Sequence, residues 1–512
     1  MRAGFVYIVG AGPGSPALAT IRAKEVLAEA DVVLYDNLIH PDLLGWAPAS
    51  AEKVWMGKVG HAHQLPQAEI TAALVERARE GKVVVRLKGG DPTIFGRLGE
   101  EATALAEAGI PFEIVPGVTA ASGAAAYAGI PLTHRDFAPS VTFVTGHRRK
   151  DGEAGPEIEW EALGRASGTL VLYMGIKHLK EVAAELIAAG RSPETPVALV
   201  RRATWADQQV VQGTLADIAV KVEASKIGPP AVAIVGEVTR LRATLAWLEK
   251  RPLWGRRILV TRAAGQAGDL SRLLRARGAE PKELPLIELR PYGHRSGTDA
   301  TLRKLFAYDW VIFSSANAVA FTFGRLEELG LDARAFGAAR VCAVGPKTAE
   351  ALAGRGIRPD VVPEEYVAEG LIEALTRTAP LQGSRVLIPR AREAREVIPE
   401  ELERLGARVE VLAVYENLRP ESYPEDVLEE LRVGTVAAVT LASSSAARNY
   451  AALCGERGID AARTPCAVIG PATKKTAEAL GLPVAVMPGE YTIEGLVEAL
   501  EEHFRGSDQE QR

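Results

Sequence analysis

Short runs of β-branched and aliphatic residues alternate along the chain with segments rich in Ala, Leu and Glu. Short apolar runs bounded by Gly and Pro are typical of strands, and the longer segments between them are typical of helices. This alternation predicts βα units and mostly parallel sheets. In the first half we expect strands over Val6–Val9, Val32–Tyr35, Val83–Leu87, Val141–Thr145, Leu170–Tyr173, Val197–Val200 and Val232–Val235, and helices such as Pro16–Ala30, Gln67–Glu80 and Leu98–Ala108.

The same pattern divides the chain into two α/β halves. Ile130–Arg135 contains a Pro and has no clear periodicity, so we expect a hinge between two lobes there. Leu241–Lys250 has the pattern of a closing helix, and Pro and Gly in Arg251–Arg257 indicate a linker. We place the first domain at 1–245 with lobes at about 1–132 and 133–245, a linker at 246–254, the second domain at 255–505 and a disordered tail at 506–512.

The second half repeats itself weakly. Val311–Asn317 resembles Val439–Ser445, and Val341–Ala349 resembles Cys466–Thr473. Each is a strand ending in small residues and followed by a helix, so we expect two similar lobes. Two extended segments serve as crossings between these lobes, which makes the first of them discontinuous. The crossings are Leu284–Tyr292 and Val411–Leu418, and the lobes are about 255–288 plus 417–505 and about 292–412.

Composition and charge exclude several classes of protein. The 512 residues are 47% hydrophobic and 24% charged, and the net charge of −5 provides no basic field for nucleic acid. Three scattered cysteines, none in a C-x-x-C pair, predict neither a zinc site nor disulfides. No apolar run reaches the ~18 residues that span a bilayer. Phe5–Val9 is too short for a signal peptide, so we expect a cytoplasmic protein.

Three loops of the first half carry the candidate chemistry. Val9–Pro16, Lys88–Arg97 and Val115–Ala121 each follow a predicted strand and contain Gly. Because ligands bind at the carboxyl ends of parallel strands, the loops predict one pocket for one cofactor. The first loop has G-x-G-x-G spacing, and an ordinary tight turn is an equal alternative. Pro13 and Pro16 remove backbone donors, so the loop suits an uncharged ligand better than a phosphate.

Polar residues near these loops offer further chemistry. Asp36 ends a predicted strand, where it can act as a base or substrate anchor; a turn or helix-cap Asp is the alternative. Lys58, His61 and His63 follow in a polar loop. The histidines have no third ligand at helical spacing, so we expect a solvated loop and no metal site.

The first half resembles uroporphyrinogen-III C-methyltransferase over about residues 3–245. The resemblance implies S-adenosyl-L-methionine as methyl donor, and methylation of uroporphyrinogen III at C2 and C7 to give precorrin-2, which feeds siroheme and cobalamin. The runs Arg86–Arg97 and Ala128–Arg135 are the most specific. The full set of matching segments is Val9–Pro16, Asp31–Asn37, Gly57–Ile70, Val84–Glu101, Pro116–Arg135, Thr145–His147 and Tyr173–Gly175.

The resemblance also implies roles for single residues. Asp36 matches the position of the base, with Lys58 beside it, and Arg97, Lys58 and Arg135 are anchors for the eight substrate carboxylates. Met174 packs on the adenosyl group in this interpretation, although a core methionine is the alternative on local grounds. Ser15, Thr93, Leu98 and Ala203 depart mildly from the family pattern. The implied cofactor-binding residues are Pro13, Gly89, Gly90, Asp91, Ile94, Thr119, Ala120, Met174 and Ala203.

The second half has hydroxyl-rich strand ends instead of a strong motif. They offer hydroxyl and N–H groups to a carboxylate-rich ligand, and ordinary helix N-capping is the alternative. This half resembles uroporphyrinogen-III synthase over about residues 255–503, on Ile258–Arg262, Asp309–Asn317, Val344–Thr348, Val414–Glu416 and Ile469–Thr473. The resemblance implies cyclisation of hydroxymethylbilane with inversion of ring D. The implied substrate contacts are Thr261, Arg262, Ser314, Thr348, Ser443, Ser444 and Thr473.

Tyr415 matches the family's tyrosine, which assists loss of the hydroxyl; a tyrosine that packs the linker is the alternative. We therefore predict a bifunctional enzyme of four α/β lobes that ends at precorrin-2. Its partners are hydroxymethylbilane and uroporphyrinogen III, and the resemblance implies a homodimer through the methyltransferase half, without nucleic acid or membrane. The alternatives are a methyltransferase acting on a later precorrin or an RNA base, and a second half that binds tetrapyrrole without catalysis.

Overall fold

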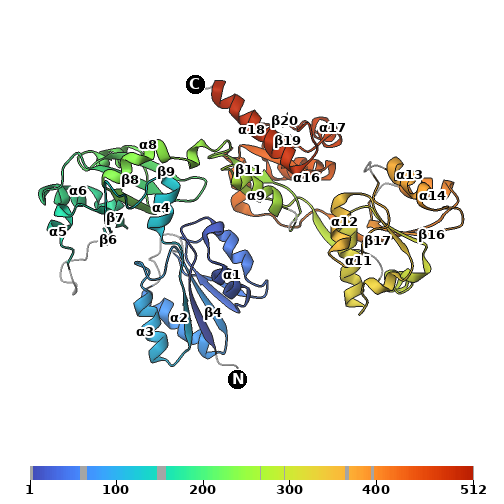
Figure 1. Cartoon of the computed structure of the whole chain (residues 1–512), viewed down its shortest axis with the longest axis horizontal. Coiled ribbons are helices and arrows are strands. Elements are labelled where there is room, and N and C mark those ends of the chain that lie inside the picture. Colours follow the sequence, from blue (N-terminus) through green and yellow to red (C-terminus); the bar gives the residue numbers. More distant parts are fainter. Residues whose placement is uncertain are drawn as a thin grey trace. The chain divides into compact units, whose positions relative to one another are not determined.

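The computed structural model describes residues 4–57, 66–146, 157–263, 265, 267–292, 295–363, 368–393 and 397–510. The chain forms two compact units, Met1–Arg256 with Leu274–Glu280, and Arg257–Leu273 with Pro281–Arg512. Each unit contains two five-stranded sheets with helices packed on them (Figure 1). The predicted α/β class, two two-lobed units in succession, is confirmed. Among the helices of the described ranges, none combines the length and apolarity that crossing a bilayer requires.

The first sheet is parallel throughout and has the order β3-β2-β4-β1-β5. Its strands are β1 (Phe5–Gly10), β2 (Val32–Tyr35), β3 (Glu52–Trp55), β4 (Val83–Lys88) and β5 (Phe112–Val115). Helix α1 (Ile21–Ala28) covers one face, and α2 (Gln67–Arg79) and α3 (Leu98–Glu107) cover the other (Figure 1). The central strand β4 is buried along its whole length. All five carboxyl ends therefore meet at one edge.

The second sheet, of order β6-β7-β10-β8-β9, is mixed. Only β6 and β7 pair in parallel; β10 is antiparallel to β7 and β8, and β9 is antiparallel to β8. The prediction of mostly parallel sheets is wrong here. The connection from β8 to β9 is short enough for a hairpin, which explains the antiparallel pairing of those two strands. The elements are β6 (Val141–Thr145), β7 (Thr169–Tyr173), β8 (Pro196–Arg201), β9 (Gln209–Thr214), β10 (Ala231–Val235), α4 (Ala120–Ala128), α5 (Trp160–Arg165), α6 (Leu179–Ala188) and α7 (Ile218–Ala224).

The end of the first unit is not the single helix that the pattern predicts. A 3₁₀ turn (Glu237–Leu241), α8 (Arg242–Leu245) and a further turn (Leu248–Lys250) replace it. The break lets the indole N–H of Trp247 donate to the Ala126 carbonyl at 2.8 Å. A tertiary contact thus overrides the helical pattern.

The third sheet collects strands from both ends of the second half, in the order β12-β11-β18-β19-β20. Its strands are β11 (Arg257–Val260), β12 (Glu280–Glu283), β18 (Ala438–Leu441), β19 (Cys466–Val468) and β20 (Val484–Val486). The helices of this part are α9 (Gly268–Ala276), α15 (Glu425–Arg432), α16 (Ser444–Arg457), α17 (Pro471–Ala479) and α18 (Ile493–Glu510). Helix α18 runs through most of the tail that we expected to be disordered, because buried Leu496, Leu500 and Phe504 recur at helical spacing.

The fourth sheet has the order β13-β17-β16-β14-β15. Its strands are β13 (Glu288–Pro291), β14 (Trp310–Phe313), β15 (Arg340–Ala343), β16 (Arg385–Ala391) and β17 (Arg408–Leu418). Its helices are α10 (Arg295–Leu302), α11 (Ala316–Glu328), α12 (Pro346–Ala353), α13 (Ala368–Thr378) and α14 (Val397–Arg404). The two crossing segments pair with each other, since β13 runs antiparallel to the end of β17 with Glu288 opposite Leu418.

Candidate functional site

Three Gly-containing loops meet at the carboxyl ends of β1, β4 and β5. The Ala11 N–H donates to the Lys88 carbonyl at 2.8 Å, and Gly12 and Gly90 exchange backbone hydrogen bonds of 3.2 and 2.7 Å. A Cβ added at Gly117 would lie 2.3 Å from the Gly90 carbonyl oxygen. Only Gly permits backbones to approach this closely. The loops therefore form one continuous edge, and the cofactor pocket that the sequence pattern predicts here stays a prediction.

Asp91 ties the second loop to the third. One carboxylate oxygen accepts hydrogen bonds from the N–H and hydroxyl of Thr93, and the other accepts from the Gly117 N–H at 3.1 Å. Asp91 thus shapes the loops from within. The residues predicted to bind the cofactor in these three loops share this edge, and their contact with a ligand stays a prediction: Pro13, Gly89, Gly90, Asp91, Ile94, Thr119 and Ala120.

The second lobe contributes directly to this edge. The Tyr173 hydroxyl, at the end of β7, lies 2.6 Å from the Thr119 hydroxyl and accepts from the Ala121 N–H at 3.0 Å. The Ser15 N–H donates to the Thr204 hydroxyl at 2.9 Å. Burial raises the pKa of the Tyr173 phenol, so the hydroxyl keeps its proton. The candidate site is thus built from both sheets of the first unit.

Unusual backbone conformations gather in the second of these loops and in the segments that follow β7 and β8 of the second sheet. Five non-glycine residues there have φ between 46° and 72°, a left-handed region that costs free energy and is concentrated at functional sites: Phe95, Arg97, Met174, Arg202 and Thr204. Met174 is 53% exposed, so the alternative of a core methionine is wrong. Ala203 is 9% exposed and lies within the core that includes α4.

Asp36 follows β2 at the same sheet edge. Its Oδ1 accepts from the Leu38 N–H at 2.9 Å, which is the turn geometry that we weighed as the alternative role. Its Oδ2 lies 3.7 Å from Nη2 of Arg86, and its side chain is 22% exposed. One oxygen of the Asp36 carboxylate therefore belongs to a turn, and the other lies beside the buried Arg86. The side chain remains partly accessible to solvent.

Behind Asp36 lies a buried ionic cluster that sequence reasoning missed. Arg86 and Lys88 of β4 are 4% and 6% exposed, and Glu101 of α3 is fully buried. Nζ of Lys88 lies 2.8 and 2.7 Å from the two oxygens of Glu101, and Nε of Arg86 lies 3.4 Å from Oε1. A signal existed, because two cations at i and i+2 in an otherwise apolar strand lie on one face and need a buried anion.

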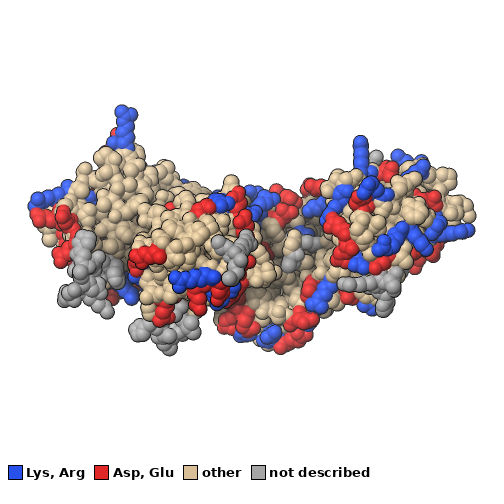
Figure 2. Space-filling view, turned by 90° about the horizontal axis from the view of Figure 1, so that it is seen from below, with Lys and Arg blue, Asp and Glu red and all other residues tan. Residues whose placement is uncertain are grey.

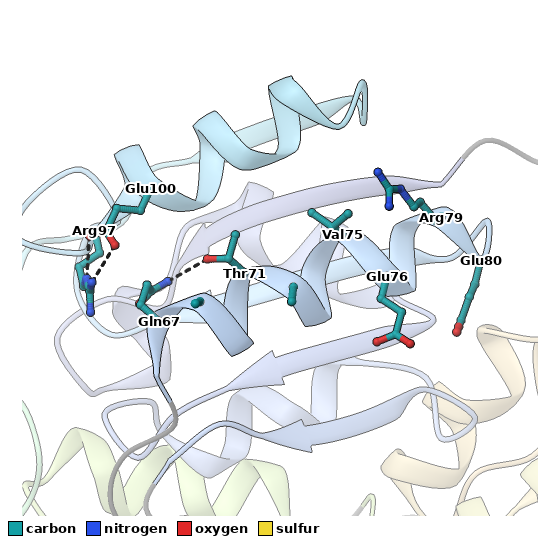
Figure 3. Close-up of a pocket in the computed structure, with 10 residues that line it drawn as sticks. Gln67, Thr71, Val75, Glu76, Arg79, Glu80, Arg97 and Glu100 are labelled. Atoms are coloured by element: carbon teal, nitrogen blue, oxygen red, sulfur yellow. Dashed lines mark hydrogen bonds and ion pairs between the residues drawn. The ribbon is translucent and has the colours of Figure 1, made fainter.

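Arg97 does not turn toward this cluster. It pairs with Glu100 at 2.8 and 2.7 Å, and this pairing raises the pKa of the guanidinium. Both residues line one end of a groove of about 1020 Å³ between α2 and α3. Figure 3 shows them beside Gln67, while Arg79 lies at the far end of the groove. A substrate carboxylate that reaches Arg97 therefore meets a guanidinium that is already paired with Glu100.

The other predicted anchors have different outcomes. Arg135 is exposed and follows His134, whose Nδ1 accepts a hydrogen bond from the Asp136 N–H. Its contact with substrate stays a prediction. Lys58 lies outside the described residues, together with His61 and His63.

In the second unit, Tyr415 lies in β17, on the side where α11 begins. Its hydroxyl is 3.3 Å from Oγ of Ser315, and its ring stacks on Phe321 with centroids 5.1 Å apart. Ser315 also caps α11 by accepting from the Ala318 N–H at 3.1 Å. Tyr415 is 6% exposed. The neighbouring Ser314 is exposed.

Several other predicted substrate contacts are engaged within the fold. The Thr261 hydroxyl is fully buried and donates to the Thr440 carbonyl at 2.6 Å, which indicates a structural role instead of ligand contact. Ser443 caps α16 by accepting from the Ala446 N–H, as the capping alternative predicted. The Ser444 hydroxyl accepts from Thr476 at 2.9 Å.

Thr348 and Thr473 are each 5% exposed and lie in the first turns of α12 and α17. Arg262 is only partly buried, and desolvation lowers the pKa of its guanidinium. It is the predicted contact in this unit best suited to a carboxylate.

The surface carries charges of both signs. On the face shown in Figure 2, Lys and Arg side chains are interspersed with Asp and Glu side chains over the described residues. A mixed surface of this kind does not concentrate a polyanion such as nucleic acid.

Comparison with known proteins gives two family matches in succession. Residues 6–219 match the family described as tetrapyrrole (corrin/porphyrin) methylases, and residues 268–498 match uroporphyrinogen-III synthase HemD. The porphyrin biosynthesis protein HemD of Ruminiclostridium josui is 35% identical over 504 residues, covering 98% of each chain. The uroporphyrinogen-III C-methyltransferase of Bacillus subtilis (strain 168) is 41% identical over 365 residues, covering 70% of this chain and 74% of that protein.

One solved structure similar to the first half is the uroporphyrin-III C-methyl transferase of Thermus thermophilus complexed with S-adenyl homocysteine. It is 42% identical and covers 46% of this chain and all of that chain, with a TM-score of 0.40.

Proposed function

The chain belongs to the family in which a tetrapyrrole methylase is joined to a uroporphyrinogen-III synthase, and from this premise we propose that it catalyses two consecutive reactions. The second unit cyclises hydroxymethylbilane to uroporphyrinogen III, with loss of water. The first unit then methylates that product at C2 and C7 to give precorrin-2. The observation that carries the proposal is the succession of the two family matches along this chain, together with a relative named porphyrin biosynthesis protein HemD that aligns over 98% of both chains.

The methyl donor is S-adenosylmethionine, which supplies a methyl group from its sulfonium when bound. The loops around Gly12, Gly90 and Gly117 suit this ligand, because the N–H groups of Ala11, Gly12, Gly90 and Gly117 donate within the loops instead of to a phosphate. Met174 stands exposed at the end of β7, where an adenosyl group can pack on its side chain. The residues that would hold the donor are Pro13, Gly89, Gly90, Asp91, Ile94, Thr119, Ala120, Met174 and Ala203.

The chain's own groups orient the substrate and move one proton. Methyl transfer to a pyrrole carbon depends mainly on placement. Asp36 then accepts a proton from the methylated ring system, and Nη2 of Arg86 lies 3.7 Å from its Oδ2. Lys58 assists it. Arg97 and Arg135 bind substrate carboxylates, and Arg97 exchanges Glu100 for the substrate to do so.

In the second unit, Tyr415 assists departure of the hydroxyl of hydroxymethylbilane. Its support is the position of its hydroxyl beside Ser315 at the start of α11, where helix N–H groups favour developing negative charge. The substrate contacts are Arg262 and Ser314, with Thr348, Ser443, Ser444 and Thr473 at the ends of the strands and the starts of the helices. We further propose that the chain assembles as a homodimer through its first unit, which light scattering tests.

The experiment is incubation of the full chain with hydroxymethylbilane, with and without S-adenosylmethionine, followed by isomer analysis and mass spectrometry. We expect uroporphyrinogen III without the donor, and a product with two added methyl groups when it is present. Isomer I alone, the product of spontaneous closure, would make the second unit a binding module. Failure to methylate supplied uroporphyrinogen III would direct attention to a later precorrin as the substrate.

A further inference from the structure

Glu101 is the anion at the centre of the buried cluster behind Asp36. Both of its oxygens contact Nζ of Lys88, and Oε1 also lies 3.4 Å from Nε of Arg86. The side-chain amide of Gln67 donates to the same oxygen at 2.9 Å. A fully buried carboxylate is tolerated only when it is paired and hydrogen-bonded in this way. Helix α3 is therefore joined to strand β4 through charges.

Arg86 links Glu101 to Asp36. Its Nη1 donates to the carbonyls of Leu34 and Leu87 at 3.4 and 3.2 Å, which fixes the guanidinium plane at the end of β2. Nε faces Glu101 and Nη2 lies 3.7 Å from Oδ2 of Asp36. One immobile cation thus lies between two carboxylates. A change in the interaction between Arg86 and Glu101 therefore alters how strongly Arg86 attracts the carboxylate of Asp36.

The cluster is balanced in charge. Two cations, Arg86 and Lys88, face two anions, Glu101 and Asp36. Lys88 is the cation that can lose its charge, because burial first and then the neighbouring Arg86 lower its pKa, while Glu101 and Asp36 oppose this effect. The pair of Arg97 and Glu100 lies at the start of α3 and interacts with this cluster only through longer-range electrostatics.

We propose that Glu101 is a positioning residue that divides the charge of Arg86 between itself and Asp36, and so sets the pH range in which Asp36 accepts a proton. This inference rests on the proposed methyltransferase function, since it concerns the base of that reaction. Glu101 is fully buried and therefore does not itself touch the substrate. The Arg86 guanidinium is the group that approaches both Glu101 and Asp36.

Two substitutions move the pH dependence in opposite directions. In Glu101→Gln, Arg86 no longer faces a second carboxylate and interacts with Asp36 alone. The Asp36 carboxylate then stays ionised to lower pH, so the acidic limb of the pH–rate profile moves down by about one pH unit. In Lys88→Met, Glu101 loses its lysine and holds Arg86 more strongly. Asp36 is then less stabilised, and the acidic limb moves up by a similar amount.

The measurement is the rate at which the methylated product that has lost its ring-system proton is formed from uroporphyrinogen III between pH 5 and 9, with the full chain at saturating S-adenosylmethionine. Glu107→Gln, which removes an exposed carboxylate at the end of the same helix, is the control and leaves the profile unchanged. A purely structural role lowers the rate in proportion to the folded fraction at every pH, without moving the limb. The double variant Glu101→Gln/Lys88→Met restores the limb toward the wild-type position.

The outcomes separate this inference from the proposed function. If the wild-type chain transfers no methyl group at any pH, the proposed function fails. If the wild-type chain is active and the limbs of the two variants stay in place or move together, the role of Glu101 is refuted. If Glu101→Gln does not fold, as thermal unfolding would reveal, the direction of the shift in Lys88→Met alone decides.

Discussion

Tyr173 gives a sharp test of how the two lobes of the first unit form one site. Its hydroxyl accepts from the Ala121 N–H at 3.0 Å and meets the Thr119 hydroxyl at 2.6 Å. Ala121 is the second residue of α4, and Thr119 supplies no side-chain cap. The Ala121 N–H is therefore one of the donors at the start of a helix that have no partner within the helix, and the Tyr173 hydroxyl of the other lobe accepts its hydrogen bond. Tyr173→Phe removes that acceptor and keeps the ring.

The magnitude follows from burial. Ala121 is fully buried, so its N–H cannot find water as a replacement, and an orphaned buried donor costs about 1–3 kcal/mol. The loss of the Thr119 contact adds little, because that residue is only half-buried. A loss of about 2 kcal/mol lowers the melting temperature of a unit of this size by about 4–8 °C. The third loop also loosens, so affinity for the donor falls.

Calorimetry of the full chain measures both effects. The transition that rises when S-adenosylhomocysteine is added belongs to the first unit, and Tyr173→Phe lowers this transition alone. Tyr127→Phe is the matched control: it removes a half-buried hydroxyl from α4 itself, while its ring keeps its contact with Trp247, with centroids 5.3 Å apart. If Tyr173→Phe melts within 1 °C of that control, the capping argument is refuted.

Three further predictions test other parts of the structure. Asp36→Asn keeps the turn to Leu38 but removes the base, so formation of the deprotonated, methylated product slows by about 10²–10⁴-fold with donor binding intact; unchanged turnover in rapid-quench assays of that product removes this role. Gly117→Ala places a Cβ 2.3 Å from the Gly90 carbonyl oxygen, so affinity for S-adenosylhomocysteine falls about tenfold or more in calorimetry, whereas Gly99→Ala, with open space around it, has no effect. Burial raises the pKa of the thiols of Cys342 and Cys466 to about 12, so native protein at pH 8 resists labelling by a disulfide reagent, and labelling of these thiols before unfolding would contradict the structure.

The sequence predicted the fold class well because apolar runs set the strands. Val32–Tyr35 and Val141–Thr145 have the predicted bounds, and β4 extends only one residue further than expected. The edge strand β9 escaped notice, since Gln209–Thr214 carries no continuous apolar run and is only half-buried. Its pairing depends on a hairpin contact across the sheet, and local pattern does not record such contacts. The broken helix at Trp247 has the same cause.

The candidate site divides in the same way. Glycine loops were predictable, because the conformations that they need restrict the residue type at each position, as at Gly117. The partners of Asp36 were not, because Arg86 and Glu101 are fifteen positions apart and ordinary as single residues. Their significance arises only when β4 and α3 pack and remove both charges from water. Local sequence thus determines the shape of the loops in this protein, whereas tertiary burial determines which charges surround Asp36. A change in the packing of α3 can therefore alter the chemistry while every loop motif stays intact.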